Sequence, residues 1–130
     1  MSIKTKIIIA DDNVHICQMM YDFLKQYDDI EILGIANTDE DEIKLIEELK
    51  PQIVISDLMR NHKYTGLDII KKYYEKKSNI KFLVISAGEQ ELIINSGVEV
   101  AGYIKKPFGN YEIIYNELKR IKSNLDYENV

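Results

Sequence analysis

The alternation of short apolar runs with helically spaced segments constrains this chain most. Four runs rich in isoleucine and valine are bounded by polar or turn residues, and a fifth is more mixed: Lys6–Ala10, Ile30–Ala36, Ile53–Ser56, Phe82–Ser86 and Val100–Lys105. Near-continuous apolar runs are typical of strands covered on both faces, as in a parallel sheet. The runs therefore predict five parallel strands.

Between these runs, apolar residues recur at steps of three and four, which predicts helices with one buried face each. Pro51 ends the second helix, and Gly97 ends a short, weakly patterned fourth helix around Glu89–Ser96. The clearly spaced sets are Val14, Cys17, Tyr21 and Leu24; Ile43, Ile46 and Leu49; Leu67, Ile70 and Tyr74; and Tyr111, Ile114, Leu118, Ile121 and Leu125. Right-handed crossovers then give an α/β fold, a doubly wound five-stranded parallel sheet with five helices.

Length and composition limit the function classes. A chain of 130 residues suits one domain, which we place at residues 1–122, with residues 123–130 as a polar tail or the start of a linker. The formal net charge of −5 argues against direct nucleic-acid contact by this domain. Because no apolar run approaches the ~18 residues of a membrane span, we expect a cytoplasmic protein without membrane contact. The single cysteine, Cys17, forms no internal disulfide and is predicted to be a small core residue.

Polar residues follow the predicted strands where each one ends. Asp11 and Asp12 follow the first strand, Asp57 the third, while Ser86 ends the fourth and Lys106 follows the fifth. In a doubly wound sheet ligands bind beyond the carboxyl ends of the strands. These side chains are therefore expected to meet at one edge, although they are far apart in sequence.

Three carboxylates close together repel one another unless a cation intervenes. Mg²⁺, or Mn²⁺, meets that need because hard cations prefer oxygen ligands. We predict Asp12, Asp57 and the backbone carbonyl of Met59 as metal ligands, with Asp11 acting through a bound water.

The remaining residues suit phosphoryl transfer. Lys106 and the hydroxyl of Ser86 are predicted to contact phosphoryl oxygens, while a carboxylate oxygen of Asp57 acts as the nucleophile and forms an acyl phosphate.

With these residues the chain resembles bacterial response-regulator receiver domains of two-component signalling, a CheY-like superfamily with flavodoxin-like (βα)5 topology, along essentially its whole length. The resemblance rests on four successive strand ends: Ala10-Asp11-Asp12-Asn13, Ser56-Asp57, Ser86-Ala87 and Ala101-Gly102-Tyr103-Ile104-Lys105-Lys106-Pro107-Phe108. No single dipeptide is specific, but four correct residue types at four strand ends are.

The resemblance implies that Asp57 accepts a phosphoryl group from a sensor histidine kinase or a phosphotransfer protein. Ser86 then shifts inward, the ring of Tyr103 follows as the switch residue, and the face made by the fourth helix, fifth strand and fifth helix changes shape. That face is expected to form a homodimer or to meet an output domain or partner protein. The domain is then no enzyme beyond its Mg²⁺-dependent self-phosphorylation and autodephosphorylation.

Two departures from the family pattern stand out. Most relatives carry Met-Pro where this chain has Arg60 and Asn61, and their glycine comes eight residues after the phosphoacceptor, whereas here Gly66 comes nine after it. The loop after Asp57 is thus one residue longer and lacks a proline. The separation from Ser86 to Lys106 is also about two residues shorter than usual, which predicts a shortened or displaced fourth helix.

Simpler interpretations stand beside these. Asp11 and Asp12 also suit the start of a helix, where Asp12 or Asn13 caps it. His15 and His62 form no ligand pair, His62 is expected to be an exposed loop residue, and the lysine pairs 71–72 and 76–77 are expected to form a solvated helix face.

Two other functions are alternatives to a phosphorylated receiver. The long loop motivates a pseudo-receiver, an interaction module of this fold that is not phosphorylated. An enzyme is disfavoured, because a haloacid-dehalogenase-type phosphatase needs an Asp where Met59 stands, and Asp11 and Asp12 would repel the phosphate of a flavodoxin-like FMN.

Overall fold

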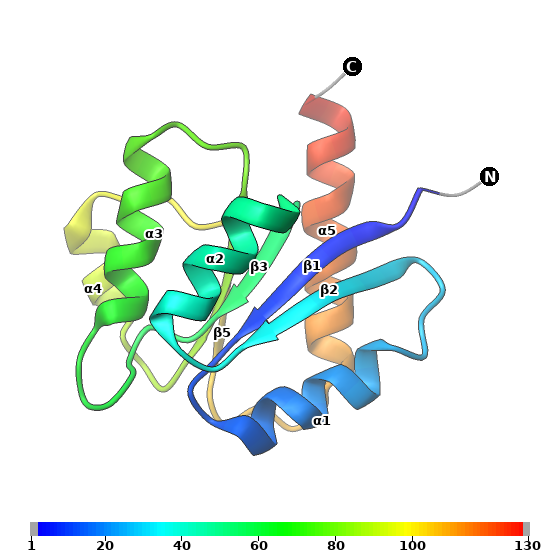
Figure 1. Cartoon of the computed structure of the whole chain (residues 1–130), viewed down its shortest axis with the longest axis horizontal. Coiled ribbons are helices and arrows are strands. Elements are labelled where there is room, and N and C mark those ends of the chain that lie inside the picture. The colour runs from blue at the N-terminus through cyan, green and yellow to red at the C-terminus, as the bar shows by residue number, and fades with distance from the viewer. Residues whose placement is uncertain (1–2, 129–130) are drawn as a thin grey trace.

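A computed structural model describes residues 3–128 and contains one parallel sheet with helices on both faces (Figure 1). The strands are ordered β2-β1-β3-β4-β5 in the sheet, which confirms the doubly wound α/β fold. The elements in chain order are β1 (Thr5–Ala10), α1 (Val14–Leu24), β2 (Ile30–Ala36), α2 (Asp39–Leu49), β3 (Ile53–Ser56), α3 (Thr65–Glu75), β4 (Lys81–Ser86), α4 (Gln90–Ser96), β5 (Gly102–Lys105) and α5 (Glu112–Glu128).

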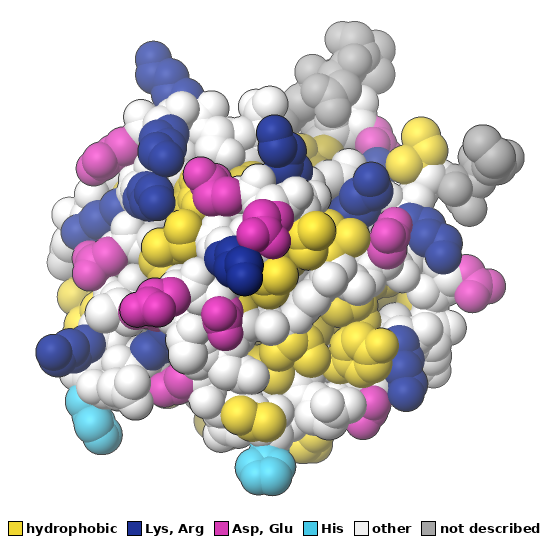
Figure 2. Space-filling model, in the orientation of Figure 1, with side chains coloured by type: hydrophobic (Ala, Val, Ile, Leu, Met, Phe, Trp, Pro, Cys, Tyr) yellow, Lys and Arg dark blue, Asp and Glu magenta, His cyan; other side chains and the backbone are white. Residues whose placement is uncertain are grey.

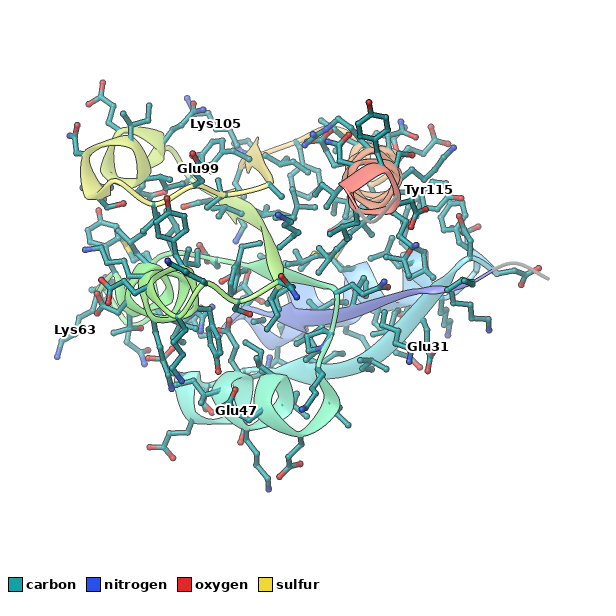
Figure 3. All side chains as sticks on the ribbon, turned by 90° about the horizontal axis from the view of Figure 1, so that it is seen from above. Glu31, Glu47, Lys63, Glu99, Lys105 and Tyr115 are labelled. Carbon is teal, nitrogen blue, oxygen red and sulfur yellow. The ribbon has the colours of Figure 1, made fainter. Side chains whose placement is uncertain are left out.

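The sheet is buried on both sides because its strands carry apolar residues at successive positions. Ile7 and Ile9 of β1 pack in a cluster with α1 and α5, whereas Ile8 and Ala10 pack in a second cluster with α2, α3 and α4. Successive strand residues point to opposite faces, so a continuous apolar run supplies both clusters. Glu47 of α2 and Tyr115 of α5, labelled in Figure 3, lie on opposite sides of the sheet.

The ends of two helices follow the predicted chemistry. The side-chain oxygen of Asn13 accepts a hydrogen bond from the backbone N–H of Ile16 at 3.1 Å, so Asn13 caps α1. Gly97 ends α4 with φ at 78°, in the left-handed region that favours glycine.

The buried helix faces differ from the simple spacing at three positions. Val14 is 59% exposed, Leu49 is 40% exposed and Tyr74 is 44% exposed. Each lies in the first or last turn of its helix. In α1 the buried residues are Cys17, Met20 and Leu24, so the prediction that Cys17 is a core residue is confirmed.

The fifth strand is shorter than the predicted run Val100–Lys105. β5 begins at Gly102, and the residues before it form a connection in which Ala101 donates a backbone hydrogen bond to the carbonyl of Phe82 at 2.9 Å. The seven residues of α4 agree with the predicted shortening of this helix. α5 continues through Glu128, so residues 123–128 of the predicted tail are helical, while residues 129–130 lie outside the described residues.

Among residues 3–128, none of the helices has the length and apolar character that a membrane crossing requires.

Charges of opposite sign gather on neighbouring helices. The first turn of α2 carries Asp39, Glu40, Asp41 and Glu42, whereas α3 and its end carry the lysine pairs 71–72 and 76–77. Figure 2 shows lysine and arginine side chains gathered over α3 at the upper left of the view. Lys76 and Lys77 are exposed and Lys71 and Lys72 are half-buried, which agrees with a largely solvated face.

Candidate phosphoryl-transfer and metal site

Three aspartates meet at the carboxyl edge of the sheet. Ligand oxygens of Asp11, Asp12 and Asp57 all lie within 4.8 Å of one another. The sheet register causes this convergence, because Asp57 donates a backbone hydrogen bond to the carbonyl of Ala10 at 3.1 Å and so extends the β1–β3 pairing by one residue. Asp11 is buried, Asp57 is half-buried and Asp12 is exposed, so the cluster opens to solvent on one side.

Lys106 brings a positive charge to this cluster from the end of β5. Its Nζ donates to Oδ2 of Asp11 at 3.0 Å and to Oδ2 of Asp57 at 3.2 Å. Its backbone N–H donates to the carbonyl of Ser86 at 2.8 Å, which continues the β4–β5 pairing and fixes where the lysine side chain starts. Burial lowers the pKa of Lys106, but Asp11 and Asp57 outweigh burial and raise it overall.

The surroundings of Asp57 disfavour its ionised form. Burial raises the pKa of the Asp57 carboxyl above its usual value; Lys106 opposes the rise and the charge of Asp11 adds to it. An added cation stabilises the ionised form of such a carboxylate. The donor set of three carboxylates therefore fits a hard divalent ion such as Mg²⁺.

Ser86 is buried and its hydroxyl donates to a carboxylate oxygen of Glu89. The Tyr103 hydroxyl donates to the carbonyl of Ser86 at 3.5 Å, so the tyrosine ring lies against the end of β4. Burial, with the charge of Glu89 second, raises the pKa of Tyr103. Ser86 and Tyr103 are thus in contact, as a coupled pair requires, and their roles remain predictions.

The loop after Asp57 contains a small hairpin. Arg60 and Lys63 exchange backbone hydrogen bonds of 2.7 and 3.0 Å, with Asn61 and His62 at the tip. Asn61 and His62 both have positive φ, 52° and 63°, as the central residues of a type I′ turn do. His62 is exposed, as expected for a loop residue.

Beneath the hairpin the loop ends are held close together. Gly66 donates its backbone N–H to the carbonyl of Leu58 at 3.0 Å, and a side chain at Gly66 would clash with the backbone of Asp57 and Leu58. Met59 donates a backbone hydrogen bond to Asp57, which lowers the pKa of that carboxyl. The metal-ligand role of the Met59 carbonyl stays a prediction.

Sequence reasoning missed a second charged cluster beside the first. Arg60 is only 4% exposed, and its guanidinium contacts Asp39 and the fully buried Glu42 of α2. A signal was present, because Glu42 lies one residue before Ile43 and four before Ile46, within the apolar face of α2. A loop arginine would still be assigned to solvent without knowledge of the fold.

The surroundings of Cys17 and His15 agree with the simpler interpretations of these residues. The thiol of Cys17 donates to the carbonyl of Asp11 at 3.3 Å, and burial together with the Asp11 charge raises its pKa to about 11. A thiol with so high a pKa is a poor nucleophile at neutral pH. His15 is exposed on α1.

Comparison with known proteins agrees with this arrangement. The family model of the response regulator receiver domain matches residues 7–116. A DNA-binding response regulator of the LuxR family from Staphylococcus aureus has 27% sequence identity and a TM-score of 0.77, and the alignment covers 90% of this chain and 98% of that one. The signal receiver domain of the NarL regulator from Mycobacterium tuberculosis has 19% identity and a TM-score of 0.77, with 92% and 98% covered. The BeF₃-activated DrrB receiver domain has 22% identity and a TM-score of 0.74, with 93% and 99% covered.

Because the family model spans most of the chain, this protein belongs to the receiver domains of two-component response regulators.

Proposed function

We propose that this domain is a phosphorylation-activated switch in which Asp57 accepts a phosphoryl group from a histidine kinase or a phosphotransfer protein. The observation that carries the proposal is the position of Lys106, whose ammonium bridges Asp57 and Asp11 beside a third carboxylate. A half-buried strand-end aspartate with two acidic neighbours and one lysine is the set that phosphoryl transfer to a carboxylate needs.

In the proposed step a carboxylate oxygen of Asp57 attacks phosphorus. A P–O bond forms, the P–N bond to the donor imidazole breaks, and its electron pair returns to the ring nitrogen. Lys106 and the Ser86 hydroxyl hold two phosphoryl oxygens. Asp11, Asp12, Asp57 and the Met59 carbonyl would hold Mg²⁺ or Mn²⁺, and the bound ion supplies positive charge to the transferring group. Water later hydrolyses the acyl phosphate, so the domain turns over its own phosphate without being an enzyme for another substrate.

The response to phosphorylation is proposed to pass through Ser86 and Tyr103. For Ser86 to bind a phosphoryl oxygen, its hydroxyl must leave Glu89. The Tyr103 ring, which contacts the Ser86 carbonyl, then follows, and the surface of α4, β5 and α5 changes shape. We propose that this surface forms a homodimer or meets an output domain or partner protein, in the cytoplasm and without nucleic-acid or membrane contact by the domain itself.

Labelling with acetyl phosphate tests the proposal. Mg²⁺-dependent uptake by the wild type, lost in Asp57→Asn, is expected, and EDTA should abolish it. BeF₃⁻, which activates the DrrB receiver domain, should bind the wild type in the presence of Mg²⁺ and leave Asp57→Asn unchanged. A wild type that takes up no label and binds no BeF₃⁻ would favour the pseudo-receiver, which the one-residue-longer loop motivates.

A further inference from the structure

Arg60 is a buried charged residue to which the proposed reaction gives no role. It lies three residues after Asp57 and is 4% exposed. One end of its guanidinium is occupied by α2, because Nη1 donates to Oδ1 of Asp39 at 2.9 Å and to a carboxylate oxygen of Glu42. Buried arginines persist in proteins when their charge is paired, and these two contacts satisfy that condition.

The other edge of the same guanidinium reaches the phosphoacceptor itself. Nε and Nη2 of Arg60 donate to the backbone carbonyl of Asp57 at 3.2 and 3.0 Å, and Nη2 also donates to the Ser56 hydroxyl at 2.9 Å. A planar fork of fixed donors can make these contacts together, whereas a lysine has one nitrogen to offer. The last residue of β3 and the first residue after it are thereby tied to α2.

The backbone that follows Arg60 reaches a second acidic residue. At the tip of the hairpin the N–H of Asn61 donates to Oδ2 of Asp12 at 3.2 Å. Lys63, on the other arm of the hairpin, extends away from the body of the domain (Figure 3). The hairpin therefore contacts two of the three clustered aspartates, Asp57 through a side chain and Asp12 through its backbone.

We propose that Arg60 is a positioning residue for phosphoryl transfer. By holding the Asp57 carbonyl between α2 and β3, it fixes the direction of the Asp57 carboxylate toward Asp11, Asp12 and Lys106. The contacts of Arg60 with Asp39, Glu42 and the Asp57 carbonyl, which we call the clamp, then fix the conformation of this loop, as a rigid backbone would otherwise do. The inference rests on the proposed role of Asp57 as phosphoacceptor.

A purely structural role is the competing explanation, in which Arg60 only neutralises buried Glu42. Two variants separate the roles. Arg60→Met removes the clamp and leaves Glu42 unpaired, whereas Arg60→Met combined with Glu42→Leu replaces the buried pair with apolar side chains, which commonly restores stability. Neither variant restores the hydrogen bonds to the Asp57 carbonyl.

The experiment measures three quantities on the whole chain: the rate of Mg²⁺-dependent labelling by acetyl phosphate, the dissociation constant for Mg²⁺, and the midpoint of urea unfolding. We expect the double variant to regain most of the unfolding midpoint but to remain about ten- to a hundredfold slower in labelling, since a displaced nucleophile costs that much in rate. Arg60→Lys should fall between wild type and Arg60→Met, because it keeps the charge and loses the fork.

Leu24→Ala is the matched control, because Leu24 is fully buried in α1 and the change destabilises the fold away from this cluster. It should lower the unfolding midpoint and leave the labelling rate unchanged. A double variant that labels at the wild-type rate overturns the positioning role.

The two proposals fail in different ways. If the wild type takes up no label, the phosphoacceptor proposal falls, and the Arg60 proposal is judged on Mg²⁺ affinity. Weaker binding in the double variant than in the wild type, by about threefold or more, would support the clamp. An unchanged Mg²⁺ affinity, or a wild type that binds no Mg²⁺, would overturn it.

Discussion

Two clusters of charge lie side by side at the carboxyl edge of the sheet, and both involve Asp57. In the first, Lys106 contacts the Asp57 carboxylate and has a side chain 20% exposed; in the second, Arg60 contacts the Asp57 backbone and has a side chain 4% exposed. The lysine has one nitrogen shared between two carboxylates, whereas the guanidinium is held on several sides.

The difference indicates that the two clusters have different roles. A group that must exchange one anionic partner for another needs solvent access and few bonds, and Lys106 meets both conditions. A group that must not move needs burial and saturated hydrogen bonding, as Arg60 has. Coulomb interactions are also stronger and less screened inside the protein than at its surface. We call Arg60, Asp39 and Glu42 the inner cluster, and Lys106 with Asp11, Asp12 and Asp57 the outer cluster. The inner cluster should therefore matter for stability and the outer cluster for the response to a ligand.

Arg60→Met should have the largest effect on folding. The change leaves Glu42 buried with its charge unpaired, which costs about 3–5 kcal/mol of unfolding free energy. Urea unfolding followed by circular dichroism measures the loss. A cost below about 1 kcal/mol would mean that the inner cluster behaves like a surface ion pair, and the contrast between the clusters would break.

The same variant should recover stability as the pH falls from about 7 to about 4.5. Burial raises the pKa of Glu42 and Arg60 opposes the rise, so removing Arg60 raises that pKa further. The folded state then binds a proton that the unfolded chain releases, and stability falls as pH rises above the unfolded value for glutamate. Unfolding free energies of the variant and the wild type, measured across this range, should converge at low pH. Parallel curves would show that Glu42 is not the group left unpaired.

Lys106→Met should cost less, about 1–2 kcal/mol without Mg²⁺, because the cluster it leaves is partly open to solvent. Lys106 and a divalent ion compete for oxygens of Asp11 and Asp57, so added Mg²⁺ should stabilise the variant more than the wild type. Thermal unfolding with and without Mg²⁺ measures both effects. An equal response to Mg²⁺ in the two proteins would show that Lys106 and Mg²⁺ do not compete for the carboxylates of Asp11 and Asp57.

Tyr115→Phe should have the smallest effect on stability, because it removes a hydrogen bond between a neutral hydroxyl and a carboxylate and leaves every ion pair in place. The Tyr115 hydroxyl donates to both carboxylate oxygens of Asp29, at 3.0 and 2.8 Å, and its loss should cost about 1 kcal/mol at neutral pH. Burial, with Asp29 next, raises the pKa of Tyr115 from 10.0 to about 12. The folded protein keeps a proton that the unfolded chain loses, so this stabilisation is present below about pH 10 and is lost as the pH rises through about 12.

The test compares urea unfolding of the wild type and Tyr115→Phe at neutral and alkaline pH. Their difference should close at alkaline pH. A difference that persists there would mean that ring packing, including the stacking on Tyr27 at 3.6 Å between centroids, accounts for it and the hydrogen bond does not.

The fold and the outer cluster were predictable because both depend on patterns along the chain. Apolar runs define strands, and parallel strands bring Asp11, Asp57 and Lys106 to one edge whatever the details of the loops. Finer features were not predictable. Tyr73 and Tyr74 are adjacent, and the spacing favoured Tyr74, whereas the buried ring is Tyr73, whose hydroxyl donates to Glu47 of α2 at 3.1 Å.

The inner cluster shows the limit of sequence patterns most clearly. Arg60 lies 18 residues from Glu42 and 21 from Asp39. Their pairing exists only because α2 packs beside the loop after β3, and nothing local in the sequence requires it. A buried arginine also contradicts the usual preference of the residue type, so only tertiary structure reveals it.

The hydrogen bond between Gly66 and Leu58 separates the length of the loop from the geometry of the site. Both ends of the loop are held beside Asp57, so residues at the hairpin tip can be added without lengthening the backbone path that positions Asp57. The entropic cost of a longer tip grows slowly, by about 0.6 kcal/mol for each doubling of loop length. The hairpin tip at His62, beyond the contact of Asn61 with Asp12, is therefore an insertion point, where evolution or an engineer can graft new sequence beside the proposed phosphorylation site without rebuilding the domain.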